Sequence, residues 1–117
     1  MNQVMWNPKD KRIQSSHMMA FINFVNQRFN ISLGNYIQLY KWSIEKTADF
    51  WGCFWEYSDI IHNKSFNHVV DDIHCMPGAK WFEGATLNFA ENLLRYRDEK
   101  VAISFYGEDG NQISITY

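Results

Sequence analysis

Three histidines and one cysteine in the second half of the chain are the first candidates for chemistry, because imidazole and thiolate groups bind zinc. His62, His68 and His74 follow one another at intervals of six residues, and Cys75 is adjacent to the last. Six residues of extended chain span roughly 20 Å, so these groups could share one ion only if the segment folded back sharply. The close ligand pairs of zinc sites are missing. We therefore predict exposed or capping histidines and no metal site.

The other nucleophile and the carboxylates do not form a pattern for catalysis either. Cys53 stands between tryptophans and phenylalanines, which predicts a buried, inert thiol. Asp71 and Asp72 are neighbours and would point to opposite faces of a strand. Glu83 and Glu91 flank an aromatic stretch, and no acid–base pair converges in the sequence. We interpret all four carboxylates as solvated charges. Glu91 is kept as a separate case because its short helix otherwise carries packing residues.

Nucleotide, nucleic acid and membrane binding are each disfavoured by what the chain lacks. No pair of its six glycines makes a phosphate-binding loop or a dinucleotide fingerprint. Trp42, Trp51 and Trp55 could stack on bases, but interleaved Lys and Arg are missing and the net charge is −2. Core packing is therefore the prediction for these rings. No apolar run is long enough to span a bilayer, and two cysteines without a disulfide framework indicate a cytoplasmic protein.

The 117 residues can form at most one domain, and their aromatic content of 17% is unusually high. A polar arm with Trp6 and Pro8 opens the chain. Ser15 or Ser16 should cap a helix whose apolar face recurs with helical spacing up to Phe29. A second, short helix is predicted around residues 36–40. Ser43 is expected to cap a third helix, in which one stripe consists of Ile44, Ala48, Trp51 and Trp55, widened by Phe50 and Phe54.

The last third of the chain predicts strands and one further helix. Residues 68–80 should be extended or irregular and stop at Pro77-Gly78. Residues 88–95 should form a short helix. The runs on either side of Gly107–Gly110 have the pattern of a β-hairpin, which is marginal without a covering sheet or helix. Because the chain stops inside a strand pattern, we expect Tyr117 to be a cut in a longer protein.

The sequence KWFEGATLNFAENLLRY, residues 80–96, either fills the core of this domain or packs on something outside the chain. Trp81, Phe82, Leu87 and Phe89 are the candidate packing residues of this stretch. If they face solvent in the isolated chain, self-association is expected.

Several segments together resemble a known family. They are a Trp near the start, the helix with FINFVN, then YKWSIEKTADFWGCFWEY, MPGAKWFEGATLNFAENLL and VAISFYGEDGNQISITY. This order resembles the N-terminal region of acetyl-CoA synthetase-type enzymes in the adenylate-forming superfamily. The AENLL helix is more similar to the acetoacetate-activating branch of that family. Glu83 stands where Pro is often found, and Phe89 where Tyr is common.

The resemblance implies an α+β region, with a helical N-terminal cap of three to four short helices over residues 1–99. Residues 100–117 would be the first β-hairpin in the sheet of a large catalytic domain. Such enzymes join an acid, here acetoacetate, to ATP and pass the acyl group to coenzyme A, with Mg²⁺. Their catalytic and phosphate-binding motifs have no counterpart in residues 1–117, so no catalytic, cofactor-binding or metal residue is assigned.

Two functions remain open from the sequence. In the first, the chain is a structural cap, inactive alone, whose partner is the remainder of its own polypeptide. In the second, it is a free-standing interaction module of α+β fold that binds a helix or strand with its aromatic face. Continuation of the reading frame into a Ser/Thr-Gly-rich loop followed by Lys would decide for the first.

Overall fold

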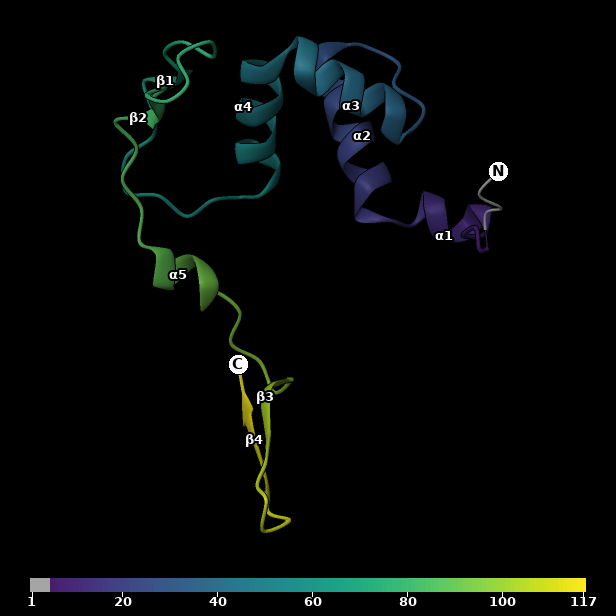
Figure 1. Ribbon diagram of the computed structural model, residues 1–117, viewed down its shortest axis with the longest axis vertical. Helices are drawn as coiled ribbons and strands as arrows, with labels where there is room; N and C mark the ends of the chain where they lie inside the picture. Colours follow the sequence, from purple (N-terminus) through teal and green to yellow (C-terminus); the bar gives the residue numbers. More distant parts are fainter. Residues whose placement is uncertain (1–4) are drawn as a thin grey trace. The chain divides into compact units, whose positions relative to one another are not determined.

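The computed structural model describes residues 5–117, which form five helices and two antiparallel strand pairs (Figure 1). The α+β class predicted from the sequence is confirmed. The chain divides into two compact units, and each is described by itself. The first comprises residues up to 59 and 67–83, and the second comprises residues 60–66 and 84–117.

The first unit contains four helices and one strand pair. Its elements are α1 (Asp10–Gln14), α2 (His17–Phe29), α3 (Tyr36–Glu45), α4 (Thr47–Tyr57), β1 (His68–Val70) and β2 (Trp81–Glu83). The helix α1 lies within the segment expected to be a polar arm, and it starts two residues after Pro8, where the ring no longer interferes. Trp6, in the predicted polar arm, is exposed, with the guanidinium of Arg12 at 5.7 Å from the centre of its ring.

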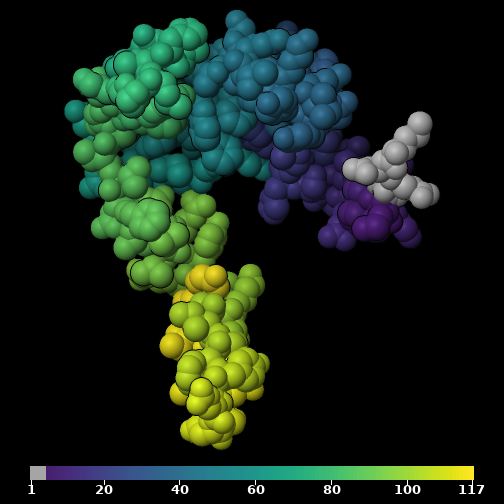
Figure 2. All heavy atoms as spheres, viewed as in Figure 1, coloured from purple at the N-terminus to yellow at the C-terminus, as the bar shows by residue number. Residues whose placement is uncertain are grey.

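Helix α2 supplies most of the core, as its apolar spacing predicts. Phe21, Ile22 and Val25 are buried on one face, and Leu39 of α3 and Cys53 of α4 complete the buried set. The N-terminus is capped by Ser16, whose hydroxyl accepts the N–H of Met19. Figure 1 shows α2, α3 and α4 side by side, and in Figure 2 the atoms of α3 and α4 (blue to teal) meet without a gap.

The predicted start of the third helix, with Ser43 as its cap, is wrong. Ser43 lies inside α3, where its hydroxyl donates to the carbonyl of Tyr40 at 2.7 Å, and α4 begins only at Thr47. The break occurs at Lys46, whose backbone (φ −126°, ψ 53°) is not helical. Ile44 therefore lies in the last turn of α3 and is exposed, instead of opening the apolar stripe of α4. Nothing in the local sequence is a strong helix breaker, so the corner depends on tertiary packing.

Helix α4 is covered on two sides. Its Phe50 and Phe54 make edge contacts with Phe21 of α2, at centroid distances of 5.8 Å and 5.6 Å. Trp51 and Trp55 instead contact rings of the strand β2. Both aromatic faces of this helix thus have partners within the unit. Trp42 packs on Phe29 at 5.1 Å, in agreement with a packing role.

The first unit also contains the strand pair β1–β2, in which His68 is opposite Glu83 and Val70 is opposite Trp81. The loop that joins the strands is irregular, as predicted. Asp71 organises it: its carboxylate accepts the backbone N–H of Lys80 at 2.8 Å and that of Asp72 at 2.7 Å. These donors, the one at Lys80 first, hold the pKa of Asp71 below its usual value.

The second unit contains α5 (Phe89–Leu93), β3 (Val101–Tyr106) and β4 (Gln112–Thr116). Both predictions for this part, a helix within residues 88–95 and a hairpin around residues 107–110, agree with the structure. Asn88 caps α5 by accepting the N–H of Glu91. The hairpin turn closes with a bond from the N–H of Gly107 to the carbonyl of Asn111, and Gly110 takes a positive φ of 82°.

We predict that Asn26→Ala destabilises the first unit by about 1–3 kcal/mol. The amide of Asn26 bonds both backbone groups of Leu33, accepting its N–H at 2.7 Å and donating to its carbonyl at 2.8 Å. Removing the amide leaves two partly buried groups without partners. The measurement is urea unfolding, with Asn23→Ala as the control because Asn23 is exposed on the same helix. Equal losses for the two variants would contradict this role.

We also predict a pH-dependent effect of Asp71→Asn. Because the folded state lowers the pKa of Asp71 from its ordinary value of 3.8, its ionised form stabilises the fold above that pH. This contribution is lost as the pH falls through the lowered pKa. The stability difference between the parent chain and Asp71→Asn should therefore be largest near neutral pH and shrink in acid. Thermal unfolding at several pH values measures it, and a difference that does not vary with pH would refute it.

Candidate interdomain packing surface

Two of the four candidate packing residues, Trp81 and Phe82, lie next to each other on β2 and contact the same helix. Trp81 meets Trp51 of α4 at a centroid distance of 6.1 Å, and Phe82 meets Trp55 at 4.8 Å. Successive side chains of a regular strand point to opposite faces. Phe82 departs from this rule with a left-handed φ of 50°, so both rings reach α4.

The backbone of Phe82 is a local strain that the aromatic contacts offset. A non-glycine residue in this region costs about 1–3 kcal/mol and persists only where its surroundings hold it. Here the ring of Phe82 is half-buried and packs on Trp55 as well as on Trp81, 6.5 Å away. The strained backbone of Phe82 allows a continuous contact between the strand pair and α4.

A glycine allows α4 to approach the strand pair closely. Gly52 lies between the two contacting tryptophans of α4, and a Cβ atom at this position would stand 3.1 Å from Cγ2 of Val69 on β1. Contacts this short are rare, so a larger residue would require the side chain of Val69 to give by a few tenths of an ångström. The missing side chain at Gly52 thus leaves room for the close approach of α4 to the strand pair.

These contacts cover only part of the candidate surface of the first unit. Trp81 remains 41% exposed and its helical partner Trp51 remains 40% exposed. Each ring thus divides its area between the unit's own packing and the outside. The proposal that Trp81 and Phe82 also pack on a further domain remains a prediction.

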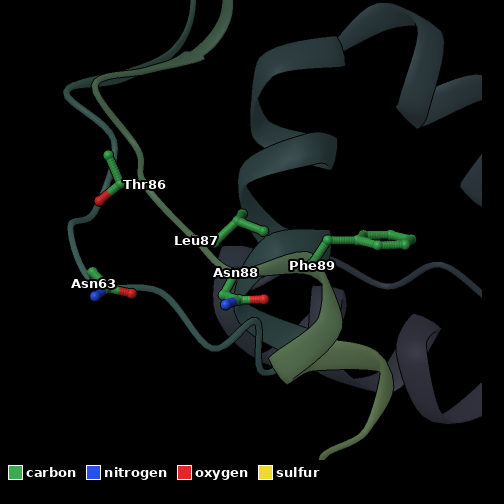
Figure 3. A pocket seen from close by; sticks show the side chains of 5 residues that line it. All are labelled: Asn63, Thr86, Leu87, Asn88 and Phe89. Atoms are coloured by element: carbon green, nitrogen blue, oxygen red, sulfur yellow. The ribbon is translucent and has the colours of Figure 1, made fainter.

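The other two candidates, Leu87 and Phe89, belong to the second unit and are exposed, Phe89 by 72%. They line a shallow depression together with Asn63, Thr86 and Asn88 (Figure 3). Figure 3 shows the ring of Phe89 extending away from Thr86 and Asn63. The carbonyl of Thr86 already accepts the N–H of Asn63, and Asn88 caps α5. The depression is therefore lined by polar and apolar groups in similar measure, and some of its polar groups already have partners.

The charged and nucleophilic candidates have structural partners. Burial, followed by the charge of Glu56, raises the pKa of the Cys53 thiol to about 11, so the thiol stays protonated at neutral pH. Glu83 and Asp71 are exposed, but the interpretation of both as simply solvated is incomplete. Glu83 lies 3.3 Å from Nε2 of His68 and 3.6 Å from Nζ of Lys80, and Asp71 holds its loop.

The remaining candidates, His62, His74, Cys75 and Glu91, are all exposed. His62 contacts the carbonyl of Ile60 through Nδ1 at 2.8 Å, and His74 and Cys75 lie in the exposed loop after β1. Glu91, in α5, is exposed. Within residues 5–117, no three histidine, cysteine or carboxylate side chains gather where an ion could bind. In the same range, no helix has the length and apolar character to cross a membrane.

One positioning residue was missed in the sequence. The amide of Asn92 accepts the N–H of Ile61 at 2.9 Å and donates to the carbonyl of the same residue at 2.8 Å. It thereby fastens residues 60–66 to α5. An Asn inside a short helix is a poor helix former, so its presence in AENLL was the available signal for a specific bond.

The chain matches known proteins along nearly its whole length. Residues 36–93 match the family described as "Acetyl-coenzyme A synthetase N-terminus". The acetoacetyl-CoA synthetase of Gallus gallus is 38% identical over 112 residues, which cover 95% of this chain and 16% of that protein. The malonamoyl-CoA synthetase vrtB of Penicillium aethiopicum is 37% identical and is matched by 98% of this chain, over 17% of its length.

A solved structure agrees with these sequence matches. The acetoacetyl-CoA synthetase of Streptomyces lividans superimposes with a TM-score of 0.81 at 26% identity, covering 98% of this chain and 18% of that chain. The chain thus spans about one sixth of the length of the curated relatives that it matches. It belongs to the acetyl-CoA synthetase N-terminus family and is a homologue of the N-terminal region of acetoacetyl-CoA synthetases.

Proposed function

We propose that this chain is the N-terminal region of an ATP-dependent acetoacetate–CoA ligase, in which it has a structural role. The observation that carries the proposal is the 34–40% identity to acetoacetyl-CoA synthetases over most of the chain. In the full-length protein, acetoacetate, ATP and coenzyme A would give acetoacetyl-CoA, AMP and pyrophosphate. ATP, Mg²⁺ and coenzyme A would bind to residues outside this chain.

The acid is proposed by chemistry as well as by name. Acetoacetyl and malonamoyl groups both carry a second carbonyl two carbons from the carbonyl that forms the thioester. The similarity to synthetases named for both groups supports an acid with a carbonyl at this position. Acetoacetate is the proposed substrate because most of the matched relatives carry its name.

The proposed role of the chain is that of a cap on the large catalytic domain of its own polypeptide. Residues 1–99 would form the cap, and residues 100–117 would begin the catalytic domain. Trp81, Phe82, Leu87 and Phe89 would contribute the contacts, since each keeps apolar area exposed or half-exposed. The two free cysteines support a reducing, cytoplasmic setting.

We predict that the full-length protein releases pyrophosphate when given acetoacetate, ATP, Mg²⁺ and coenzyme A, and that the 117-residue chain does not. Acetate and malonamate serve as competing acids in the same assay. A higher kcat/KM for acetate than for acetoacetate would refute the proposed substrate. Pyrophosphate release by the short chain would refute the structural role.

We predict that Trp81→Ala costs more in the full-length protein than in the 117-residue chain. In the short chain the change removes contacts with Trp51 and Phe82, worth about 1–2 kcal/mol for a ring buried only in part. In the full-length protein, the part of the Trp81 ring that is exposed in the short chain would also pack on the catalytic domain. The substitution would remove that contact as well, so thermal stability should fall further. Trp6→Ala is the control, because Trp6 is 66% exposed and lies outside the proposed surface. An equal cost in both chains would exclude Trp81 from an interdomain contact.

A further inference from the structure

The turn between β3 and β4 holds a dipeptide that occurs once in the chain. Asp109 is followed by Gly110, whereas each of the other six aspartates precedes a residue with a side chain, and no asparagine precedes a glycine. Both residues of the dipeptide are exposed, and Figure 1 shows their turn at the end of the hairpin opposite the C-terminus. An aspartate before a glycine can react with the backbone, because no side chain shields the nitrogen that follows it.

The carboxylate of Asp109 folds back over the backbone of this turn. Its Oδ1 atom accepts the N–H of Asn111 at 3.1 Å, and its Oδ2 atom accepts the side-chain amide of the same residue. A Cβ atom placed on Gly107 would collide with Oδ1, so the carboxylate also fills the space beside that glycine. The nitrogen of Gly110 donates to the carbonyl of Gly107 at 3.0 Å. One tight turn thus holds both the carboxyl group and the nitrogen that follows it.

The missing side chain of Gly110 is not needed for packing. Among the described residues, none apart from its chain neighbours comes within 4 Å of the place where a Cβ atom would stand. Its φ of 82° lies in the left-handed region, which glycine favours and asparagine tolerates. Asparagine can therefore stand at position 110 with little disturbance, so the structure supplies a control in which only the access to the nitrogen changes.

We propose that Asp109 is a site of covalent self-modification, at which aspartate converts to isoaspartate without an enzyme. The backbone nitrogen of Gly110 attacks Cγ of the protonated Asp109 carboxyl group. The N–Cγ bond forms, and the hydroxyl leaves as water with the proton of the N–H, which gives a succinimide ring. Water then adds to one of the two ring carbonyls and breaks its bond to nitrogen. Opening at Cγ restores aspartate, and opening at the backbone carbonyl carbon of Asp109 gives isoaspartate with the same atoms and no change of oxidation state.

Isoaspartate at this position weakens the turn. The main chain then runs through Cβ and Cγ of residue 109, which adds one atom to the backbone before Gly110. The bond from the N–H of Gly107 to the carbonyl of Asn111, at 2.7 Å, encloses this point, and so does the bond from Gly110 to Gly107. The modification therefore disturbs the closure of the β3–β4 hairpin. It depends on residues of this chain alone, so the inference stands apart from the proposed ligase activity.

Incubation in water enriched in a heavy oxygen isotope tests the site. The full-length protein is kept folded at neutral pH and digested at intervals, and the peptides that carry residues 107–111 are analysed by mass spectrometry. Each opening of the succinimide leaves one solvent oxygen on residue 109, and fragmentation distinguishes isoaspartate from aspartate. Label and isoaspartate should appear at Asp109 at least about tenfold faster than at Asp98, because Asp98 is an exposed aspartate of the same unit that precedes a glutamate. Equal rates at the two aspartates would overturn the proposal.

Two variants test the geometry of the turn. Gly110→Asn should slow the reaction of Asp109 at least about fivefold, because a side chain then shields the attacking nitrogen. Asn111→Ala should speed it several-fold, because it frees the Asp109 carboxylate from the amide and eases local opening of the turn. An unchanged rate in Gly110→Asn would overturn the proposal. If that variant does not fold, Asp109→Asn replaces it, since its amide forms the same succinimide with loss of ammonia; no loss of ammonia at residue 109 would then be the contrary result.

A last control separates the folded turn from the unfolded chain as the place of reaction. Asn26→Ala weakens the first unit, whereas Asp109 lies in the second. The rate at Asp109 should be the same in this variant as in the parent protein. A rate that rises in step with the loss of stability would show that Asp109 reacts only in unfolded molecules, and the native turn would be abandoned as the site.

Discussion

The packing of α4 between α2 and β2 is the constraint on which the first unit depends. Phe50 and Phe54 use one side of the helix to meet Phe21, and Trp51 and Trp55 use the other to meet the rings of β2. Gly52 leaves room for the close approach of α4 to the strand pair. The high aromatic content of a small chain follows from this arrangement, because a helix covered on two sides needs large rings on both.

The aromatic stretch of residues 80–96 consequently has two roles in two places. Its first part, at Trp81 and Phe82, completes the first unit by packing on α4, although Trp81 stays partly exposed. Its second part, from Leu87 onward, belongs to the second unit and is largely exposed. The sequence offered core packing and external packing as alternatives, and the structure assigns core contacts to the first part. External packing remains a proposal for both parts.

Elements with local signals could be predicted from the sequence, and those set by tertiary contacts could not. The Ser16 cap and the apolar spacing of α2 predicted that helix, and the Gly107–Gly110 turn predicted the hairpin. The α3–α4 corner at Lys46 escaped prediction because neighbouring residues are acceptable in either helix. The left-handed backbone of Phe82 was also invisible, since phenylalanine, unlike glycine, asparagine and aspartate, does not favour that conformation. The candidate packing residues were found by their chemistry. The roles of Asn92 and Asp71 were not predicted, because these side chains bond backbone groups that are distant in sequence.

The route of the chain through its two units carries a consequence for how the region can be shortened. The polypeptide leaves the first unit after residue 59, returns at 67 and leaves again after 83. The detour of residues 60–66 is fastened by the Asn92 amide and by the bridge between Lys64 and Thr86. A breakpoint inside residues 67–83 would leave both units incomplete, and a break directly after residue 59 or 83 would still divide one of them. No single breakpoint therefore separates the chain into two complete units.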